Sequence, residues 1–258
     1  MKEELSGGRE GKIHKMDNKV FRPSNSWTKA VHDFLNFMHS QNLEFVPKVL
    51  SLNESLECVS FMPGEVYNYP LPSFFLSDDM LISASSLLKN FHKYGHMYIK
   101  QLNGHEQWML PIQQPVEVMC HGDFAPYNVT IQNNKASGII DFDTLKPGPI
   151  MSDIAYAIYR WVPFTNPNNP DSYSDLKGQI KRANVFMHNY GLSKSQRGSL
   201  VDFMIKRLED LVNYMRVEAA NGNLDFQANI EAGHMQLYID DIAYFKNNRD
   251  VIMKAVQE

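Results

Sequence analysis

The sequence predicts an α+β protein with a small β-rich amino-terminal part and a larger helical carboxy-terminal part. Three observations support this class. Short apolar runs separated by turn pairs lie on both sides of a single predicted helix in the first 64 residues. Apolar residues recur at helical spacing over much of the remaining chain. Between these regions, residues 118–155 hold two apolar runs, each of which leads into a group of reactive polar side chains. We expect the functional site there.

Two strands and a helix are expected near the amino terminus. The apolar runs on either side of the Asp17–Asn18 pair predict a hairpin, because such a dipeptide suits a two-residue turn. Apolar residues at three-and-four spacing then predict a helix over residues 26–40, with Ser26 as its N-cap.

Two further strands and a break complete the first lobe. The strands are expected on either side of a turn at residues 53–54, and a Pro-Gly pair at 63–64 then interrupts the pattern. We therefore expect an amino-terminal lobe over residues 1–64, with a hinge near 59–64, and a second lobe over residues 65–258.

The second lobe is expected to be mainly helical. Its first helix carries one apolar face from about residue 81 onward, and two short hairpins follow in the central stretch. Helices are then expected over 154–161, over roughly 174–190, and after a Ser193–Gln196 capping box.

Composition restricts the class of protein. A net charge of −4 argues against a nucleic-acid binder, because phosphate contacts need clustered Lys and Arg. The polar amino terminus predicts no signal peptide, and no apolar run approaches the roughly 20 residues of a membrane helix. Cys58 and Cys120 have neither disulfide nor metal-ligand spacing. We therefore expect a cytoplasmic protein without a nucleic-acid or membrane partner, and its oligomeric state stays open.

The central stretch combines a candidate proton acceptor with candidate metal ligands. Asp123 starts a loop after an apolar strand, and Asn128 follows five positions later. Asp141 comes 18 residues after Asp123, which leaves room for one hairpin turning at 133–134. A carboxylate can accept a hydroxyl proton, and carboxylate and amide oxygens suit Mg²⁺. Asp143 is either a second metal ligand or a turn residue.

The spacing of these three residues is that of the phosphoryl-transfer loops of kinases. The segments HGDFAPYN and IDFD resemble those of the aminoglycoside phosphotransferase and choline kinase family, the small-molecule branch of the protein-kinase-like fold. The resemblance covers most of the chain and implies a two-lobed kinase-like fold that uses ATP and Mg²⁺. It implies Asp123 as the catalytic residue and Asn128 and Asp141 as metal ligands.

The amino-terminal segment resembles a bacterial branch of this family that includes trifolitoxin-immunity-like proteins. The resemblance places Gly7 and Gly8 in the loop that covers the phosphates. It puts Arg22 where the family has its phosphate-binding lysine, and it assigns backbone groups of Ser60 and Met62 to adenine.

This lobe also departs from the family pattern. Arg22 keeps the charge of a lysine but not its geometry, and Lys19 is a rival for the same role. The helix expected over 26–40 offers no Glu to pair with Arg22, only His32 and Asp33.

Further residues are expected to support the site or to contact the substrate. His121 is expected to orient the catalytic loop, and Asp153 to anchor the start of a helix. Trp161 could pack against a sugar or an ammonium group, and Asp240 and Asp241 could bind a cationic substrate. Trp161 could instead belong to the core, and Asp240 and Asp241 to a solvated surface.

The expected activity is transfer of the γ-phosphate of Mg-ATP to a hydroxyl of a small polar, cationic molecule. An aminoglycoside or related amino sugar is the first choice, and choline-like, fructosamine-like and amino-acid alcohols stay open. One alternative is a catalytically weak immunity or sequestration protein that binds a toxin or antibiotic without phosphorylating it. The segment GIIDFDT also matches a phosphatase motif with Asp141 as nucleophile, but the helices expected after it do not fit that class.

Overall fold

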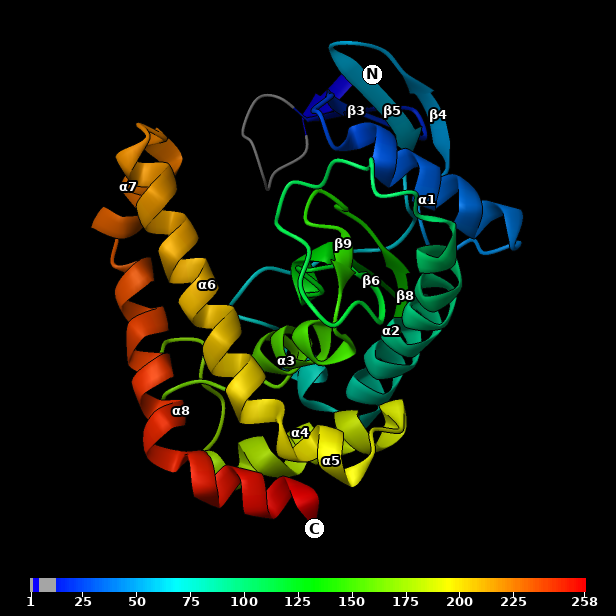
Figure 1. The fold of residues 1–258 in the computed structure, drawn as a ribbon. Helices are drawn as coiled ribbons and strands as arrows, with labels where there is room; N and C mark the ends of the chain where they lie inside the picture. The colour runs from blue at the N-terminus through cyan, green and yellow to red at the C-terminus, as the bar shows by residue number, and fades with distance from the viewer. Residues whose placement is uncertain (1, 5–12) are drawn as a thin grey trace. The chain divides into compact units, whose positions relative to one another are not determined.

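A computed structural model describes residues 2–4 and 13–258, so the predicted glycines Gly7 and Gly8 lie outside the described residues. The chain divides into two compact units (Figure 1). The first unit holds the residues up to Tyr67 together with Leu87–Ile150, and the second holds Asn68–Ser86 and Met151–Glu258. The predicted lobe boundary near residue 64 remains a prediction.

The first unit contains a five-stranded antiparallel sheet with the strand order β1-β2-β3-β5-β4. Its strands are β1 (Lys2–Glu4), β2 (His14–Met16), β3 (Lys19–Pro23), β4 (Val49–Leu52) and β5 (Leu56–Ser60). The predicted hairpin at Asp17–Asn18 is confirmed, with Asp17 at a φ of 57° in the turn. Although β4 follows β3 among the strands, β5 is the strand that pairs with β3. This order brings side chains that are distant in the sequence onto neighbouring strands.

Helix α1 (Thr28–Ser40) confirms the expected helix but not its N-cap. Trp27 is the N-cap residue, with no side-chain cap. The segment before the helix is a local turn, in which Thr28 N donates to Asn25 O (3.1 Å) and Asn25 N donates to Thr28 Oγ1 (2.9 Å). Ser26 lies inside this turn, so its hydroxyl does not cap the helix.

The central stretch forms one hairpin enclosed by a second strand pair. Strands β7 (Val129–Gln132) and β8 (Lys135–Ile139) form the expected hairpin, and the residues at 133 and 134 both have positive φ, as a tight two-residue turn requires. Strand β6 (Val118–Cys120) pairs with β9 (Lys146–Gly148) instead of forming a hairpin of its own, so the prediction of two hairpins is wrong. The β6–β9 pair brings both ends of the loop region together.

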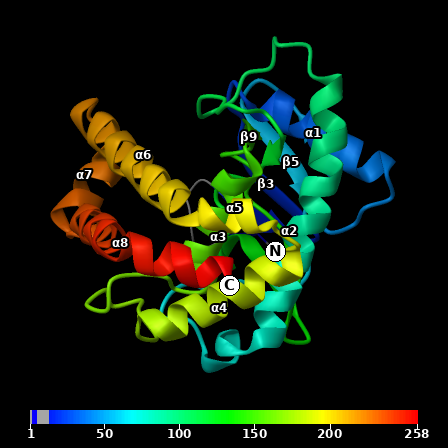
Figure 2. The same ribbon diagram turned by 60° about the horizontal axis from the view of Figure 1, so that its bottom comes forward.

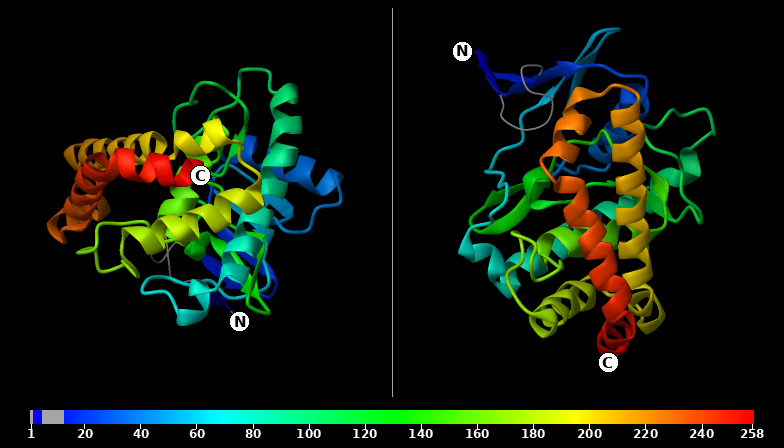
Figure 3. Two further views of the ribbon diagram at one scale, coloured as in Figure 1. Left: turned by 90° about the horizontal axis from the view of Figure 1, so that it is seen from below. Right: turned by 90° about the vertical axis from the view of Figure 1, so that its left-hand side faces the viewer.

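Helix α2 (Asp78–Tyr98) continues into the short helix η2 (Ile99–Gln101), and helices make up most of the second unit. Its helices are η1 (Ser73–Leu76), α3 (Ile150–Trp161), α4 (Leu176–Tyr190), α5 (Lys194–Gly198), α6 (Leu200–Ala220), α7 (Leu224–Glu231) and α8 (His234–Gln257). The predicted Ser193–Gln196 capping box is present and starts α5. Figures 2 and 3 show α6 and α8 running alongside each other, with α7 at their connection. None of the helices in the described part of the chain combines the length and the apolar character needed to cross a bilayer.

Candidate active site

The loop after β6 turns sharply at Gly122 and presents Asp123. Gly122 has a φ of 82°, and a Cβ there would lie 2.6 Å from Thr144 O, so only glycine fits. Thr144 Oγ1 donates to His121 O at 2.8 Å and holds the other side of the turn. The predicted catalytic carboxylate therefore stands on a backbone that the neighbouring loop fixes.

Both oxygens of the Asp123 carboxylate accept a hydrogen bond. Tyr127 OH donates to Oδ1 at 2.8 Å, and Asn128 Nδ2 donates to Oδ2 at 2.8 Å. Asn128 Nδ2 also lies 3.0 Å from Asp123 O, which fixes the orientation of the amide. Because its nitrogen faces Asp123, the amide presents its oxygen on the opposite side, as a metal ligand would require.

The loop that carries Asp141 is tied to the loop that carries Asp123. Ile140 N donates to Asn128 O at 2.9 Å, just beyond the paired residues of the β7–β8 hairpin. His121 is fully buried, and its Nδ1 accepts from Asp123 N (3.3 Å) while its Nε2 donates to Ile140 O (2.9 Å). His121 thus bridges both loops as a neutral ring, which is the geometry that the predicted supporting role needs.

Asp141 and Asp143 converge on the guanidinium of Arg22. Arg22 Nη1 donates to Asp141 Oδ1 at 3.1 Å, and Nη2 lies 3.3 Å from Asp143 Oδ1. Trp27 Nε1 also donates to Asp143 Oδ1, at 3.2 Å. Asp141 has a φ of 58°, a left-handed conformation that turns its side chain out of the end of the hairpin. The Asp141 and Asp143 carboxylates therefore lie close enough to contact the same positive group.

Glu57 and His32 are part of this network; the sequence pointed to His32 on the helix but did not reveal Glu57. Arg22 Nε forms an ion pair with Glu57 Oε1 at 2.7 Å, and His32 Nε2 contacts Glu57 Oε2 at 2.6 Å. Glu57 is 1% exposed. Burial alone would lower the pKa of Arg22, but the carboxylates of Asp143, Asp141 and Glu57 together raise it above its usual value. The guanidinium is therefore firmly charged.

The acidic partner of Arg22 comes from a strand and not from a helix. Arg22 and Glu57 are directly opposite each other in the β3–β5 ladder, where side chains on the same face are neighbours. The pairing of β3 with β5 is the signal that would have identified Glu57. The same alternation places Lys19, three positions before Arg22, on the other face of the sheet, which favours Arg22 over Lys19.

The donor set fits a magnesium ion that a substrate helps to hold. Three carboxylates around one guanidinium carry a net charge of −2 with His32 counted as neutral, which one divalent cation would balance. Mg²⁺ is usually held by one or two carboxylates, with water and substrate phosphates completing its shell. Within residues 2–4 and 13–258, no three His, Cys, Asp or Glu side chains form a complete metal cage. Asp141, Asp143 and the Asn128 amide offer two carboxylates and one amide oxygen, a partial ligand set that water and substrate phosphates would complete.

The predicted adenine contacts are only partly available. The Ser60 N–H already donates to Lys48 O at 2.8 Å, and Ser60 Oγ accepts from Lys48 N at 2.8 Å. The next N–H, that of Phe61, donates to Asn18 O at 2.8 Å. Met62 is buried, with 8% exposure. If the Ser60 N–H bound adenine, it would have to give up its hydrogen bond in the sheet. Of the two Ser60 backbone groups, the carbonyl is therefore the candidate for an adenine contact.

Two of the predicted residues in the second unit lie inside the protein. Asp153 is buried in the first turn of α3. Trp161 is fully buried at the end of the same helix, with its ring 5.8 Å from that of Phe75. The structure therefore places Trp161 in the core, because no part of its side chain is open to a substrate.

Asp240 and Asp241 border a small cavity of about 210 Å³ in the second unit, but only Asp240 is exposed. Asp241 is fully buried and accepts from Tyr159 OH (2.8 Å), Asn169 Nδ2 (2.9 Å) and Asn166 N (2.6 Å). Burial raises the pKa of Asp241 to about 6, although these hydrogen bonds act in the other direction. Asp241 is therefore an internal anchor for the 166–169 loop, and Asp240 is the better candidate for a ligand contact.

Known proteins with the same fold include small-molecule kinases. A choline/ethanolamine kinase family protein from Mesorhizobium loti superposes with a TM-score of 0.67 at 14% identity, covering 100% of this chain and 92% of its own. An ADP-bound aminoglycoside phosphotransferase gives a TM-score of 0.54 at 13% identity, covering 95% of this chain and 91% of its own. These likenesses confirm the predicted protein-kinase-like fold.

Sequence comparison adds one curated relative and a family. The trifolitoxin immunity protein of Rhizobium leguminosarum bv. trifolii is 24% identical over an alignment of 216 positions, and the match covers 78% of this chain and 78% of the relative. Residues 14–176, which include Arg22, Asp123, Asn128 and Asp141, match the model of the phosphotransferase enzyme family. This match spans more than half of the chain, and the chain belongs to the phosphotransferase enzyme family.

Proposed function

We propose that this protein transfers the γ-phosphate of ATP to a hydroxyl of a small polar, cationic molecule. The observation that carries the proposal is the hydrogen-bonded junction of the two loops. Asn128 contacts the Asp123 carboxylate through its side chain (2.8 Å) and the Asp141 loop through its backbone (2.9 Å). A proton acceptor and oxygen ligands for a cation thus stand side by side, as phosphoryl transfer requires.

In the proposed reaction, the acceptor hydroxyl donates to Asp123, which orients it toward the γ-phosphorus. The new oxygen–phosphorus bond forms as the bond to the bridging β–γ oxygen breaks, and ADP leaves with that electron pair. The hydroxyl proton passes to Asp123. Tyr127 and Asn128 hold the carboxylate in place, and Arg22 offers positive charge to the phosphates. Mg²⁺, held by Asn128, Asp141 and Asp143, would neutralise phosphate charge.

The proposed acceptor is a hydroxylated amine, with an amino sugar as first choice. The names of the similar structures refer to choline and ethanolamine and to aminoglycosides, and all of these molecules combine a hydroxyl with an amine or a quaternary ammonium group. Asp240, an exposed carboxylate beside the small cavity of the second unit, remains the sequence-based candidate for an amine contact within that unit.

ATP consumption and product formation test this proposal directly. The purified protein would be incubated with ATP, MgCl₂ and a panel of amino sugars and amino alcohols, and products would be identified by mass spectrometry. We expect a phosphorylated product with at least one amine, and its loss when EDTA removes the divalent cation. Binding of ATP and amine without any phosphorylated product would contradict the proposal.

The second candidate function is sequestration of a toxin or antibiotic without chemical change. It is favoured by the similarity to a trifolitoxin immunity protein. A cell-protection assay with the Asp123→Asn variant separates the two functions. A kinase would lose protection with this change, whereas a sequestering protein would keep it.

A further inference from the structure

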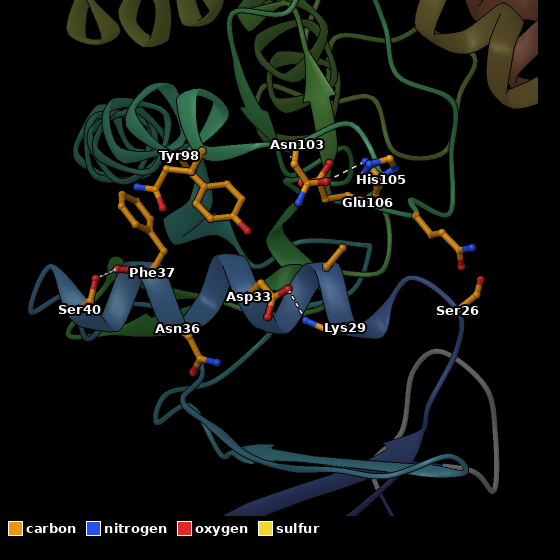
Figure 4. A pocket seen from close by; sticks show the side chains of 13 residues that line it. Ser26, Lys29, Asp33, Asn36, Phe37, Ser40, Tyr98, Asn103, His105 and Glu106 are labelled. Carbon is orange, nitrogen blue, oxygen red and sulfur yellow. Dashed lines mark hydrogen bonds and ion pairs between the residues drawn. The ribbon is translucent and has the colours of Figure 1, made fainter.

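A large polar pocket lies between helix α1 and the loop that follows α2, and none of the residues proposed for phosphoryl transfer lines it. Its volume is about 710 Å³, within the range typical of small-molecule sites (Figure 4). Trp27 and His32 of α1 contact Asp143 and Glu57, whereas Lys29 and Asp33 of the same helix line this pocket. The pocket and the candidate active site therefore use different residues of one helix.

Tyr98 is a buried residue whose hydroxyl faces this pocket. Its ring packs against Phe34 (5.1 Å between centroids) and Phe37 (5.2 Å), so the side chain is held in place at 7% exposure. Figure 4 shows the hydroxyl pointing toward α1 on the side of Asp33. Within the described parts of the chain this hydroxyl has no hydrogen-bond partner, although buried tyrosines usually find one. Burial, with Asp33 and Glu106 nearby, raises the pKa of Tyr98 to about 12, so the group is a hydrogen-bond donor.

Two carboxylates give the pocket a negative character. Glu106 accepts from Asn103 N (2.8 Å) and Gly104 N (3.0 Å). Burial alone would raise the pKa of Glu106, but these backbone bonds lower it, so the group is ionised. Asp33 forms an ion pair with Lys29 at 2.7 Å, in which both side chains are at least half exposed. Such a surface pair contributes at most about 1 kcal/mol, so a bound cation can replace Lys29.

We propose that this pocket is a separate binding site for a small ammonium ion that carries hydroxyl groups. Asp33 and Glu106 would attract the ammonium group, and a ligand hydroxyl would accept the hydrogen bond that Tyr98 offers. The ring of Phe37 supplies an apolar surface for the carbon skeleton. A neutral ligand would satisfy Tyr98 but not the carboxylates.

Glucosamine and N-acetylglucosamine are suitable probes, because both carry hydroxyls and only the first is a cation. Chemical shifts of the full-length ¹⁵N-labelled protein would be followed during titration with each sugar. We expect glucosamine to shift the backbone amides of residues 103–106 and to bind about tenfold more tightly than N-acetylglucosamine, a difference of about 1.4 kcal/mol, because only glucosamine makes a charge-assisted contact. Tyr98→Phe and Asp33→Asn should each weaken glucosamine binding about fivefold. Tyr94→Phe, on the same helix outside the pocket, is the matched control.

The same titration separates this site from the proposed phosphoryl-transfer site. Shifts confined to residues 120–128, equal binding of the two sugars, unchanged affinity in Tyr98→Phe, or no shifts at all would each overturn the proposed pocket ligand. The phosphorylation assay is independent of these shifts, so either proposal can fail alone.

Discussion

Asp123 and Asp241 each accept a hydrogen bond from a tyrosine hydroxyl at 2.8 Å, yet their surroundings are opposite. Asp123 is partly exposed on a loop, next to Asn128 and to the loop that carries two more carboxylates. Asp241 is fully buried in helix α8, and all of its partners are neutral donors. Asp123 and its tyrosine lie where a substrate could reach them, whereas Asp241 and its partners hold a loop against helix α8.

The comparison shows that solvent access and neighbours separate a reactive carboxylate from a structural one. Burial raises the pKa of Asp241 to about 6, so this residue is charged at neutral pH only at a cost to stability. Arg22 shows the reverse case, in which three neighbouring carboxylates raise the pKa of a buried guanidinium and keep it charged. The predictions below test this division, from the largest expected effect to the smallest.

Asp123→Asn should separate the two carboxylates most clearly. The asparagine keeps the shape of the side chain but cannot accept a proton, and a general base contributes about 10²–10⁴-fold to the rate. We expect a loss of roughly 10³-fold in kcat with ATP binding retained, measured by turnover and by nucleotide titration. Asp250→Asn, at a side chain of the second unit that is 98% exposed, is the control for charge removal, with little change in kcat expected. Full turnover in Asp123→Asn would show that Asp123 is not a reactive carboxylate.

Glu57→Gln should destabilise the protein and lower its activity, because it leaves the Arg22 guanidinium without its buried partner. Removing one member of a buried ion pair typically costs about 3–5 kcal/mol, which urea denaturation would measure. Glu54→Gln, in the exposed turn of the same hairpin, is the matched control and should be within about 0.5 kcal/mol of the wild type. Equal stability of the two variants would show that Arg22 does not depend on Glu57.

The pH dependence of stability should reveal Asp241. Its pKa is about 6 in the folded protein, against 3.8 for an unperturbed aspartate, so the folded state holds the proton more tightly. This contribution to stability is complete below about pH 4 and is lost as the pH rises through 6, by no more than about 3 kcal/mol. Urea denaturation at pH 4.5 and 7.5 should therefore show a smaller pH effect in Asp241→Asn than in the wild type. An identical pH effect in both proteins would contradict the assigned burial.

The two tyrosine hydroxyls provide the finest test. Tyr127→Phe should lower kcat by about tenfold with little loss of stability, because it frees one oxygen of Asp123. Tyr159→Phe should instead lower the free energy of unfolding by about 1–2 kcal/mol and leave kcat nearly unchanged, because it removes a buried hydrogen bond to Asp241. The outcome that refutes the comparison is the same pattern of change in both variants.

Local sequence was sufficient for most of the elements and for placing the predicted site residues in one stretch of chain. Turn pairs and apolar spacing predicted the hairpin at Asp17–Asn18 and helix α1, because these features depend on neighbouring residues. The same holds for Asp123, Asn128 and Asp141, which a single hairpin brings together within a short stretch of chain. The kinase-like α+β class followed from the order of these elements and from two specific motifs.

Only the tertiary structure decided which distant residues complete the site and which acidic and aromatic residues are buried. Glu57 meets Arg22 because β5, not β4, pairs with β3, and strand order is not encoded in any local pattern. Trp161 has an aromatic ring and Asp241 a carboxylate that could contact a substrate, but the packing of the second unit buries both side chains. The sequence by itself determined which residues can do chemistry, whereas burial and long-range pairing determined which of them are placed to do it.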